Sequence, residues 1–370
     1  MLLLLAPLAA AQSSSTADVY RIAAAQVPQA ADDTQRFVLS HALDTPLDPA
    51  AADLLKRGDK SLQLFDAASL LFLESWGLDE SDPTYGGRTI RELPQLADLV
   101  ILRARQNAAQ SKVDLALEDC AKLSLLSRRL SFQPSLSRQA QQNVIMEKAL
   151  GMAASLLPRM SAEQIEHFGQ SLHDLPPPAN VIDIAQTEQE TYLWLYGKLI
   201  ENNEVRQLTS GATGAINLVF GIQTQPIKVD DLARDPQRAQ EVLNQTREVF
   251  TKMTDALKQP PEERAAAMKI IPASFDFSHD LSRNAAQIVL RIYRQNERHE
   301  ALMDMFQCAA AIFSDPARPI DPARAKAVAG RFECRAVEGG FELKWRGEDG
   351  ELVLRMGPAV IRVNPTTAGS

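Results

Sequence analysis

The chain has 370 residues, of which 45% are hydrophobic and 23% are charged. These proportions are typical of a folded globular protein rather than of a disordered or membrane-embedded chain, and the length allows one large domain or two ordinary ones. The formal net charge is −8, from 39 basic and 47 acidic side chains. This charge argues against general binding to nucleic acids, which needs a basic surface.

The N-terminus resembles a secretory signal peptide. Residues 1–15 read MLLLLAPLAAAQSSS, an apolar core followed by small residues. The A-x-A pattern at Ala9–Ala11 predicts cleavage before Gln12, and so a signal peptide over 1–11. The usual basic start is missing, so the alternative is a hydrophobic helix that stays attached. We predict an exported protein, periplasmic or extracellular, with no transmembrane span after signal removal, since no other stretch approaches ~18 apolar residues.

After a leader over residues 12–48, the spacing of apolar residues predicts a helical domain over 49–202. Three apolar stripes lie between Leu93 and Leu157 and recur at i, i+3, i+4 and i+7, which indicates amphipathic helices buried on one face. Short links join these helices, and neighbours with short links pack antiparallel. We therefore expect a mainly α protein built from antiparallel helical hairpins, as a bundle or a solenoid-like array.

The composition changes after residue 202. Residues 203–230 contain three glycines and predict an irregular connector. A second helical part follows over 231–330, in which Ser278 is predicted to cap a long helix. The helical part ends at a proline-rich link.

The C-terminal residues alternate between apolar and polar side chains, which is the period of a strand. Apolar side chains recur at every second position around Phe341 and around Leu352, with glycine-containing turns at 339–340 and 349–350. These patterns predict a small antiparallel β-meander over 331–363, with a fourth strand at Val360–Val363. Residues 364–370 form a polar tail.

Three cysteines leave at least one thiol unpaired within the chain. Cys120 lies on an apolar stripe and is expected to be an inert buried residue. Cys308 and Cys334 could form a disulfide if the predicted sheet packs on the last long helix, and the sequence leaves that pairing open.

Common catalytic and cofactor motifs are absent. The sequence contains no P-loop, G-x-G-x-x-G, H-E-x-x-H or G-x-S-x-G pattern, and we predict no cofactor and no metal site. Arg128 and Arg129, followed by Arg138, form the strongest basic cluster, which we interpret as a solvated helix end. His299 lies among glutamates on the last long helix, and we interpret that stretch as a solvated face.

One helix combines acidic and aromatic residues. Glu188 and Glu190 are the candidate catalytic residues, and Tyr192 and Trp194 are the candidate ligand-binding residues, since carboxylates beside aromatic rings suit a glycan. The alternative is that Tyr192 and Tyr196 face the core while both glutamates lie on the solvated side.

The order of the parts resembles uncharacterised exported bacterial α-helical proteins. The resemblance lies in the signal, the helical-hairpin body, the Leu175–Pro178 break before Glu188 and Glu190, and the C-terminal hairpin near Trp345. It implies no activity and no site. We predict a non-enzymatic exported scaffold or protein-interaction protein of the cell envelope, with an unidentified protein partner. The alternatives are an enzyme acting on an envelope glycan or other polymer, and a small-ligand binding protein that uses residues 203–230.

Overall fold

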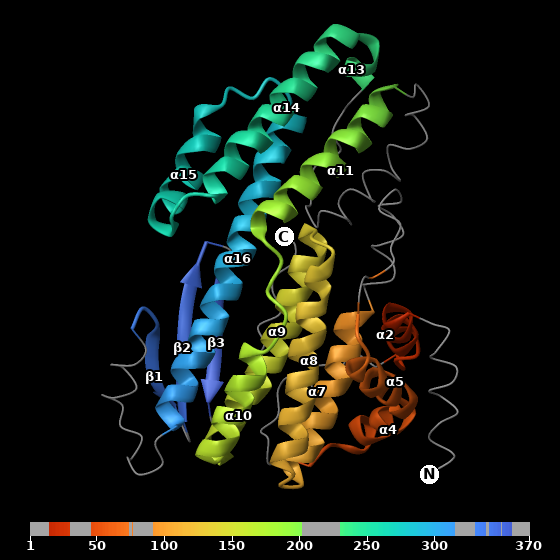
Figure 1. Ribbon diagram of the computed structural model, residues 1–370, viewed down its shortest axis with the longest axis vertical. Coiled ribbons are helices and arrows are strands. Elements are labelled where there is room, and N and C mark those ends of the chain that lie inside the picture. The colour runs from red at the N-terminus through yellow and green to blue at the C-terminus, as the bar shows by residue number, and fades with distance from the viewer. Residues whose placement is uncertain are drawn as a thin grey trace.

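The computed structural model shows a mainly helical protein with a small antiparallel sheet near its C-terminus (Figure 1), which confirms the predicted fold class. The predicted signal peptide, most of the connector, the fourth strand and the tail lie outside the described residues. The residues that the structure describes are 15–29, 46–73, 76, 92–201, 230–314, 330–337, 340–348 and 350–356.

The first group of helices covers the N-terminal half of the chain. The three predicted apolar stripes fall on α7 (Leu93–Ala109), α8 (Val113–Arg129) and α9 (Leu136–Leu156), which follow one another through short links and pack against each other. The α2 helix packs on α5. The other members are α2 (Thr16–Ala25), α4 (Pro49–Arg57), α5 (Asp59–Leu70), α10 (Ala162–His173) and the 3₁₀ turns η1 (Leu130–Phe132) and η2 (Leu157–Arg159).

The second group of helices lies at the other end of the molecule (Figure 1). The α11 helix falls within the predicted 49–202 domain but packs against α14 and α16. The first half of α16 belongs to this group, and its second half packs on α9, α10 and the sheet. The members are α11 (Val181–Glu201), α13 (Asp230–Arg234), α14 (Pro236–Leu257), α15 (Pro261–Ser274) and α16 (Asp280–Phe313).

Side-chain caps start several of these helices. Ser161 and Gln164 form a capping box at the start of α10. The predicted cap of α16 is wrong by one residue. His279, not Ser278, is the N-cap, and its Nδ1 accepts a hydrogen bond from the Leu281 amide at 3.2 Å. Ser278 instead hydrogen-bonds Gln245 on α14.

Two separate apolar clusters form the core. The α16 helix contributes to both, with residues from Leu281 to Tyr293 in the second cluster and residues from Ala301 to Ile312 in the first. The α9 helix does the same, because Leu136 lies in the second cluster and its apolar residues from Ile145 onward lie in the first. The two helices therefore join the two clusters.

The sheet has the order β1–β2–β3, with both pairs antiparallel, and it packs on α16 and α9. Phe341 and Leu343 alternate with polar residues and are buried, as the sequence predicts. Gly347 pairs with Gly350 at the end of the second hairpin, where Gly350 has a φ of 122° that favours glycine. The strands are β1 (Glu333–Val337), β2 (Gly340–Gly347) and β3 (Gly350–Met356).

All three cysteines are free thiols. Cys120 is buried, as predicted, and its pKa is raised by burial. Cys308 and Cys334 are partly buried and unpaired, so the disulfide that the sequence left open is not formed in this structure. Among the described helices, none combines the length and the apolar character needed to cross a membrane.

A substitution at Leu343 tests whether packing of the sheet against the first cluster contributes to stability. Its side chain is fully buried in the middle strand, so Leu343→Ala is expected to lower the free energy of unfolding by about 2–5 kcal/mol. Ile270→Ala on α15, where the side chain is 66% exposed, should change it by less than about 0.5 kcal/mol. Denaturant unfolding measures both, and equal effects would show that the sheet is not packed on the body.

Candidate functional site

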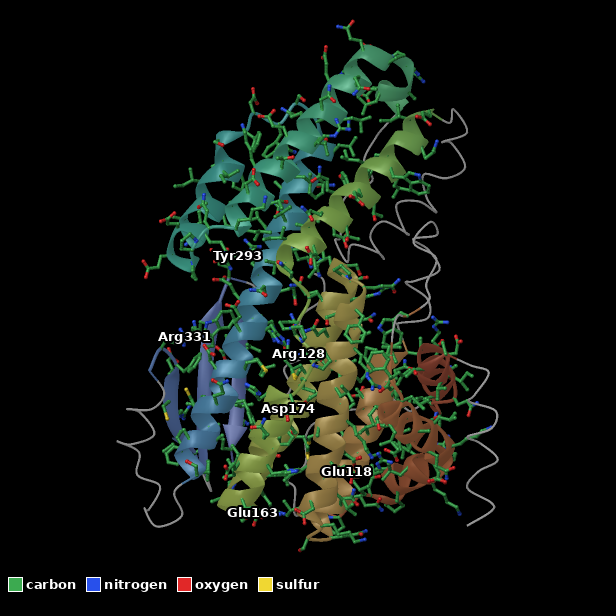
Figure 2. The ribbon with its side chains drawn as sticks, viewed as in Figure 1. Glu118, Arg128, Glu163, Asp174, Tyr293 and Arg331 are labelled. Atoms are coloured by element: carbon green, nitrogen blue, oxygen red, sulfur yellow. The ribbon has the colours of Figure 1, made fainter. Side chains whose placement is uncertain are left out.

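The strongest cluster of buried polar groups lies between the two apolar clusters, and we call it the polar seam. It is formed where the C-terminal end of α8, the first half of α9 and the middle of α16 meet. Figure 2 labels Arg128, which belongs to this cluster, near the middle of the long axis of the molecule, and Tyr293 on the neighbouring part of α16. The polar seam consists of Arg128, Gln139, Asn143, Glu147, Gln295, Arg298 and His299.

A buried ion pair holds α16 to α9. Arg298 Nε donates to Glu147 Oε1 at 2.6 Å, and Arg298 Nη2 donates to Glu147 Oε2 at 3.0 Å. The side chains are only 10% and 13% exposed. A bidentate guanidinium–carboxylate pair fixes the relative position of its two elements, because both donors must meet both oxygens.

Amide groups extend the contact along both helices. Asn143 Nδ2 donates to the carbonyl and to the side-chain oxygen of Gln295, both at 2.8 Å. Gln139 Nε2 donates to the Ile292 carbonyl at 3.3 Å. Three polar side chains at four-residue spacing on α9 thus each contact α16.

His299 on α16 also contacts α9. Its Nδ1 lies 3.1 Å from Asn143 Oδ1. The Asn143 amide nitrogen already donates to Gln295, so the oxygen accepts and the imidazole carries its proton on Nδ1. Burial and then the positive charge of Arg128 lower the pKa of His299 to about 3, so the ring is neutral at physiological pH. Its Nε2 is buried without a hydrogen-bond partner.

Arg128 and Arg129 are both buried, so the interpretation of a solvated helix end is wrong for them. Both terminal nitrogens of Arg129 donate hydrogen bonds, to the Tyr20 hydroxyl and to the carbonyls at the end of α5. Arg128 is 7% exposed, and its Nε and Nη1 have no acceptor within the described part of the chain. Burial lowers its pKa.

The predicted glutamates do not share a site. Residues two apart on a helix point about 200° apart, so one can be buried and the other exposed. Glu188 is 2% exposed, and its Oε1 accepts a hydrogen bond from the Leu136 amide at 2.7 Å, at the start of α9. Glu190 is exposed. The expectation that both glutamates lie on the solvated side is therefore wrong for Glu188.

The predicted aromatic residues also separate. Tyr192 is buried, as the core alternative predicts, and its hydroxyl donates to the Leu281 carbonyl at 3.1 Å. Its ring packs against Tyr196 and Phe250. Trp194 is 49% exposed on the other side of α11. No common ligand surface includes both Tyr192 and Trp194.

The pKa of the Glu188 carboxyl group is unusually high. Burial raises its pKa to about 7, against the opposing effects of the Leu136 hydrogen bond and the Arg138 charge. Its Oε2 is buried without a partner. A carboxyl group that is protonated near neutral pH can exchange a proton, but no second ionisable group at hydrogen-bond distance from it is found among the described residues.

An apolar edge forms the most exposed hydrophobic surface in the described chain. Leu70 is 84% exposed and Phe72 is 80% exposed. The residues that alternate with them, Leu71 and Leu73, pack toward the first cluster. The backbone leaves α5 in an extended conformation at Leu71, which sends alternate side chains to opposite sides. We call Leu70 and Phe72 the α5 edge.

An open depression of about 420 Å³ lies at the start of α14. Most of the side chains that line it are charged or polar, and one of them, Arg238, lies 3.5 Å from Asp231 on α13. Asp235 and Glu241 are among the lining residues, and no group of three or more His, Cys, Asp or Glu side chains that could hold a metal ion is found within the described ranges.

Comparisons with protein-family models, with curated proteins and with solved structures found no match.

Glu188 provides a direct test of the buried carboxyl group. The folded protein keeps its proton up to about pH 7, whereas the unfolded chain loses it near pH 4.5, so stability contributed by Glu188 falls as the pH rises through this window. Glu188→Gln keeps the oxygen that accepts from Leu136. We expect it to match the wild type at about pH 4 and to be more stable by up to ~3 kcal/mol at about pH 8.

Urea unfolding at both pH values measures this difference. The exposed Glu190→Gln serves as the matched control and should show no such pH dependence. A Glu188→Gln variant that is equally destabilised at both pH values would contradict the buried, protonated carboxyl group.

Proposed function

We propose that the protein is a non-enzymatic exported scaffold of the cell envelope that binds a protein partner through the α5 edge. The observation that carries this proposal is the exposure of two large apolar side chains on a backbone that hydrogen bonds hold in place. Scattered exposed hydrophobic residues are common, but adjacent and preorganised ones are a feature of binding surfaces.

Two partly buried hydrogen bonds hold the backbone of the α5 edge. Thr16 Oγ1 on α2 donates to the Phe72 carbonyl at 2.6 Å, and Arg129 Nη2 on α8 donates to the Leu71 carbonyl at 2.5 Å. Leu71 and Leu73 pack into the first cluster on the opposite side. The side chains of Leu70 and Phe72 are thereby directed outward, so a partner would bind them with little loss of backbone conformational entropy.

The partner chemistry follows from the exposed groups. Phe72 is an aromatic anchor and Leu70 is an aliphatic one, and such anchors insert into apolar pockets or grooves of another protein. The enzyme alternative has weaker support, because Glu188 and Glu190 lie on different sides of α11. The small-ligand alternative rests on residues 203–230, of which all but residue 230 lie outside the described structure.

Site-specific crosslinking tests the α5 edge in the native envelope. We expect a photo-crosslinking phenylalanine analogue at position 72 to capture a defined protein, and the same analogue at position 270 on α15 to capture none. Leu70→Ser with Phe72→Ser should weaken binding of the purified partner by about tenfold or more while leaving the unfolding curve nearly unchanged.

The control variant is Ile270→Ser, which also replaces an exposed apolar residue and should bind normally. Equal crosslinking at positions 72 and 270, or normal binding by the double variant, would contradict the proposal.

Export is tested separately. The sequence of residues 1–11 predicts that a reporter active only outside the cytoplasm becomes active when fused after residue 370, and that removal of residues 2–11 abolishes this activity. Mass spectrometry of the exported protein should find Gln12 at the N-terminus. Reporter activity that survives the deletion would contradict the predicted signal.

A further inference from the structure

The outer edge of β1 has no partner strand in the described structure. The sheet has the order β1–β2–β3, so β1 is an edge strand that pairs with β2 alone. The α16 helix packs on β2 and β3, and α9 packs on β3. Glu333, Arg335 and Ala336 are exposed, although Ala336 lies opposite the buried Phe341. An open strand edge presents backbone N–H and C=O groups that can pair with a further strand.

The face of the sheet that is turned away from the first cluster carries a row of charges that alternate in sign. Arg355 on β3 lies opposite Glu342 on β2, and their side chains form an ion pair at 2.6 Å. Arg335 on β1 lies opposite the same Glu342. The row of Arg355, Glu342 and Arg335 therefore ends at the open edge with a positive charge.

A second row on this face ends at the same edge with a negative charge. Glu333 on β1 lies opposite Lys344 on β2, and its carboxylate lies 3.5 Å from Arg346. Lys344 in turn pairs with Glu351 on β3 at 2.6 Å. The residues that end the two rows, Arg335 and Glu333, are two positions apart on one strand. The edge thus presents a positive and a negative side chain on one face.

These charges favour one register for the pairing of β1 with a second β1. Two antiparallel copies of a strand are related by a two-fold axis, and paired residues share a face, so the axis passes through a residue that lies opposite itself. An axis at Arg335 would place two guanidinium groups directly opposite each other, which is unfavourable. An axis at Ala336 would leave Glu333 without a partner. An axis at Cys334 places Glu333 of each copy opposite Arg335 of the other, so both charge rows continue across the edge in alternating sign.

We propose that β1 pairs with β1 of a second copy of this chain, antiparallel and with the two-fold axis at Cys334, which joins two three-stranded sheets into one. Figure 1 shows β1 at one margin of the molecule and α5 at the opposite margin, so this pairing leaves the α5 edge open. The shared edge is short, and small interfaces of this kind form weak dimers. This inference does not depend on the proposed scaffold function.

Sedimentation of the full-length protein tests the pairing. Over about 1 to 500 μM we expect a reversible dimer with a dissociation constant on the order of tens of micromolar. Arg335→Glu and Glu333→Arg each create two pairs of like charges at the edge, and each should weaken dimerisation by about tenfold or more. An equimolar mixture of the two variants restores both opposite-charge pairs and should form a heterodimer about as tightly as the wild type. Arg57→Glu, on the exposed side of α4, is the matched control and should dimerise normally.

Disulfide trapping tests the register. With the axis at Cys334, the two Cα atoms of this residue lie roughly 4.5–5.5 Å apart, a separation that a disulfide can bridge. In Cys308→Ser, added diamide would take two electrons and two protons from the facing Cys334 thiols, and a covalent dimer should form. The double variant with Cys334→Ser retains only the buried Cys120 and should give no covalent dimer.

A wild-type chain that stays monomeric over the whole concentration range would overturn the proposal. Dimerisation that neither charge variant weakens, or a mixture of the two variants that forms no heterodimer, would overturn it as well. If a charge variant does not fold, disulfide trapping still decides. The register is wrong if Cys308→Ser yields no covalent dimer, or if the dimer also forms without Cys334.

Discussion

The bidentate contact between Arg298 and Glu147 is the constraint on which the rest of the structure depends. It fixes α16 against α9 at the level where both helices pass from one apolar cluster to the other. Neither cluster extends through this level, because Asn143, Gln295 and His299 occupy it. The relative position of the two halves is therefore set by directional polar contacts rather than by apolar packing, which has little directionality.

The same region explains why buried charges differ so much in their surroundings. Arg129, the last residue of α8, donates hydrogen bonds to carbonyl oxygens at the C-terminal end of α5. The partial negative charge at that end of a helix favours a cation. Arg129 also holds the backbone from which Phe72 projects. Arg128 is also buried, but its Nε and Nη1 have no acceptor among the described residues, and its positive charge contributes to the lowered pKa of His299. One turn of helix thus supports both the exposed α5 edge and the polar seam.

The sequence was sufficient for much of the fold. The apolar period of α7, α8 and α9 and the alternation of β2 and β3 are local signals, and each depends on a single element facing the core. The same reasoning failed for His299 and Arg128, which were assigned to solvent because polar residues surround them. His299 contacts Asn143 across 156 residues of chain, and no local period can reveal that the polar side of one helix meets the polar side of another.

A weaker signal for the polar seam was present in the sequence. Gln139, Asn143 and Glu147 recur every four residues on α9, and Gln295 and His299 have the same spacing on α16. Two polar stripes of this kind, each interrupting an apolar stripe, indicate helices that pair through buried hydrogen bonds. Glu188 offered no such signal, because its burial follows from the start of α9 meeting α11.

A double-mutant cycle on Glu147 and Arg298 tests this account most directly. Removing one partner leaves the other charge buried, so Glu147→Leu and Arg298→Met are each expected to lower the free energy of unfolding by about 3–5 kcal/mol. The double variant leaves no unpaired charge and should lose less than either single variant. Additive losses in the double variant would contradict the claim that this pair joins the two halves.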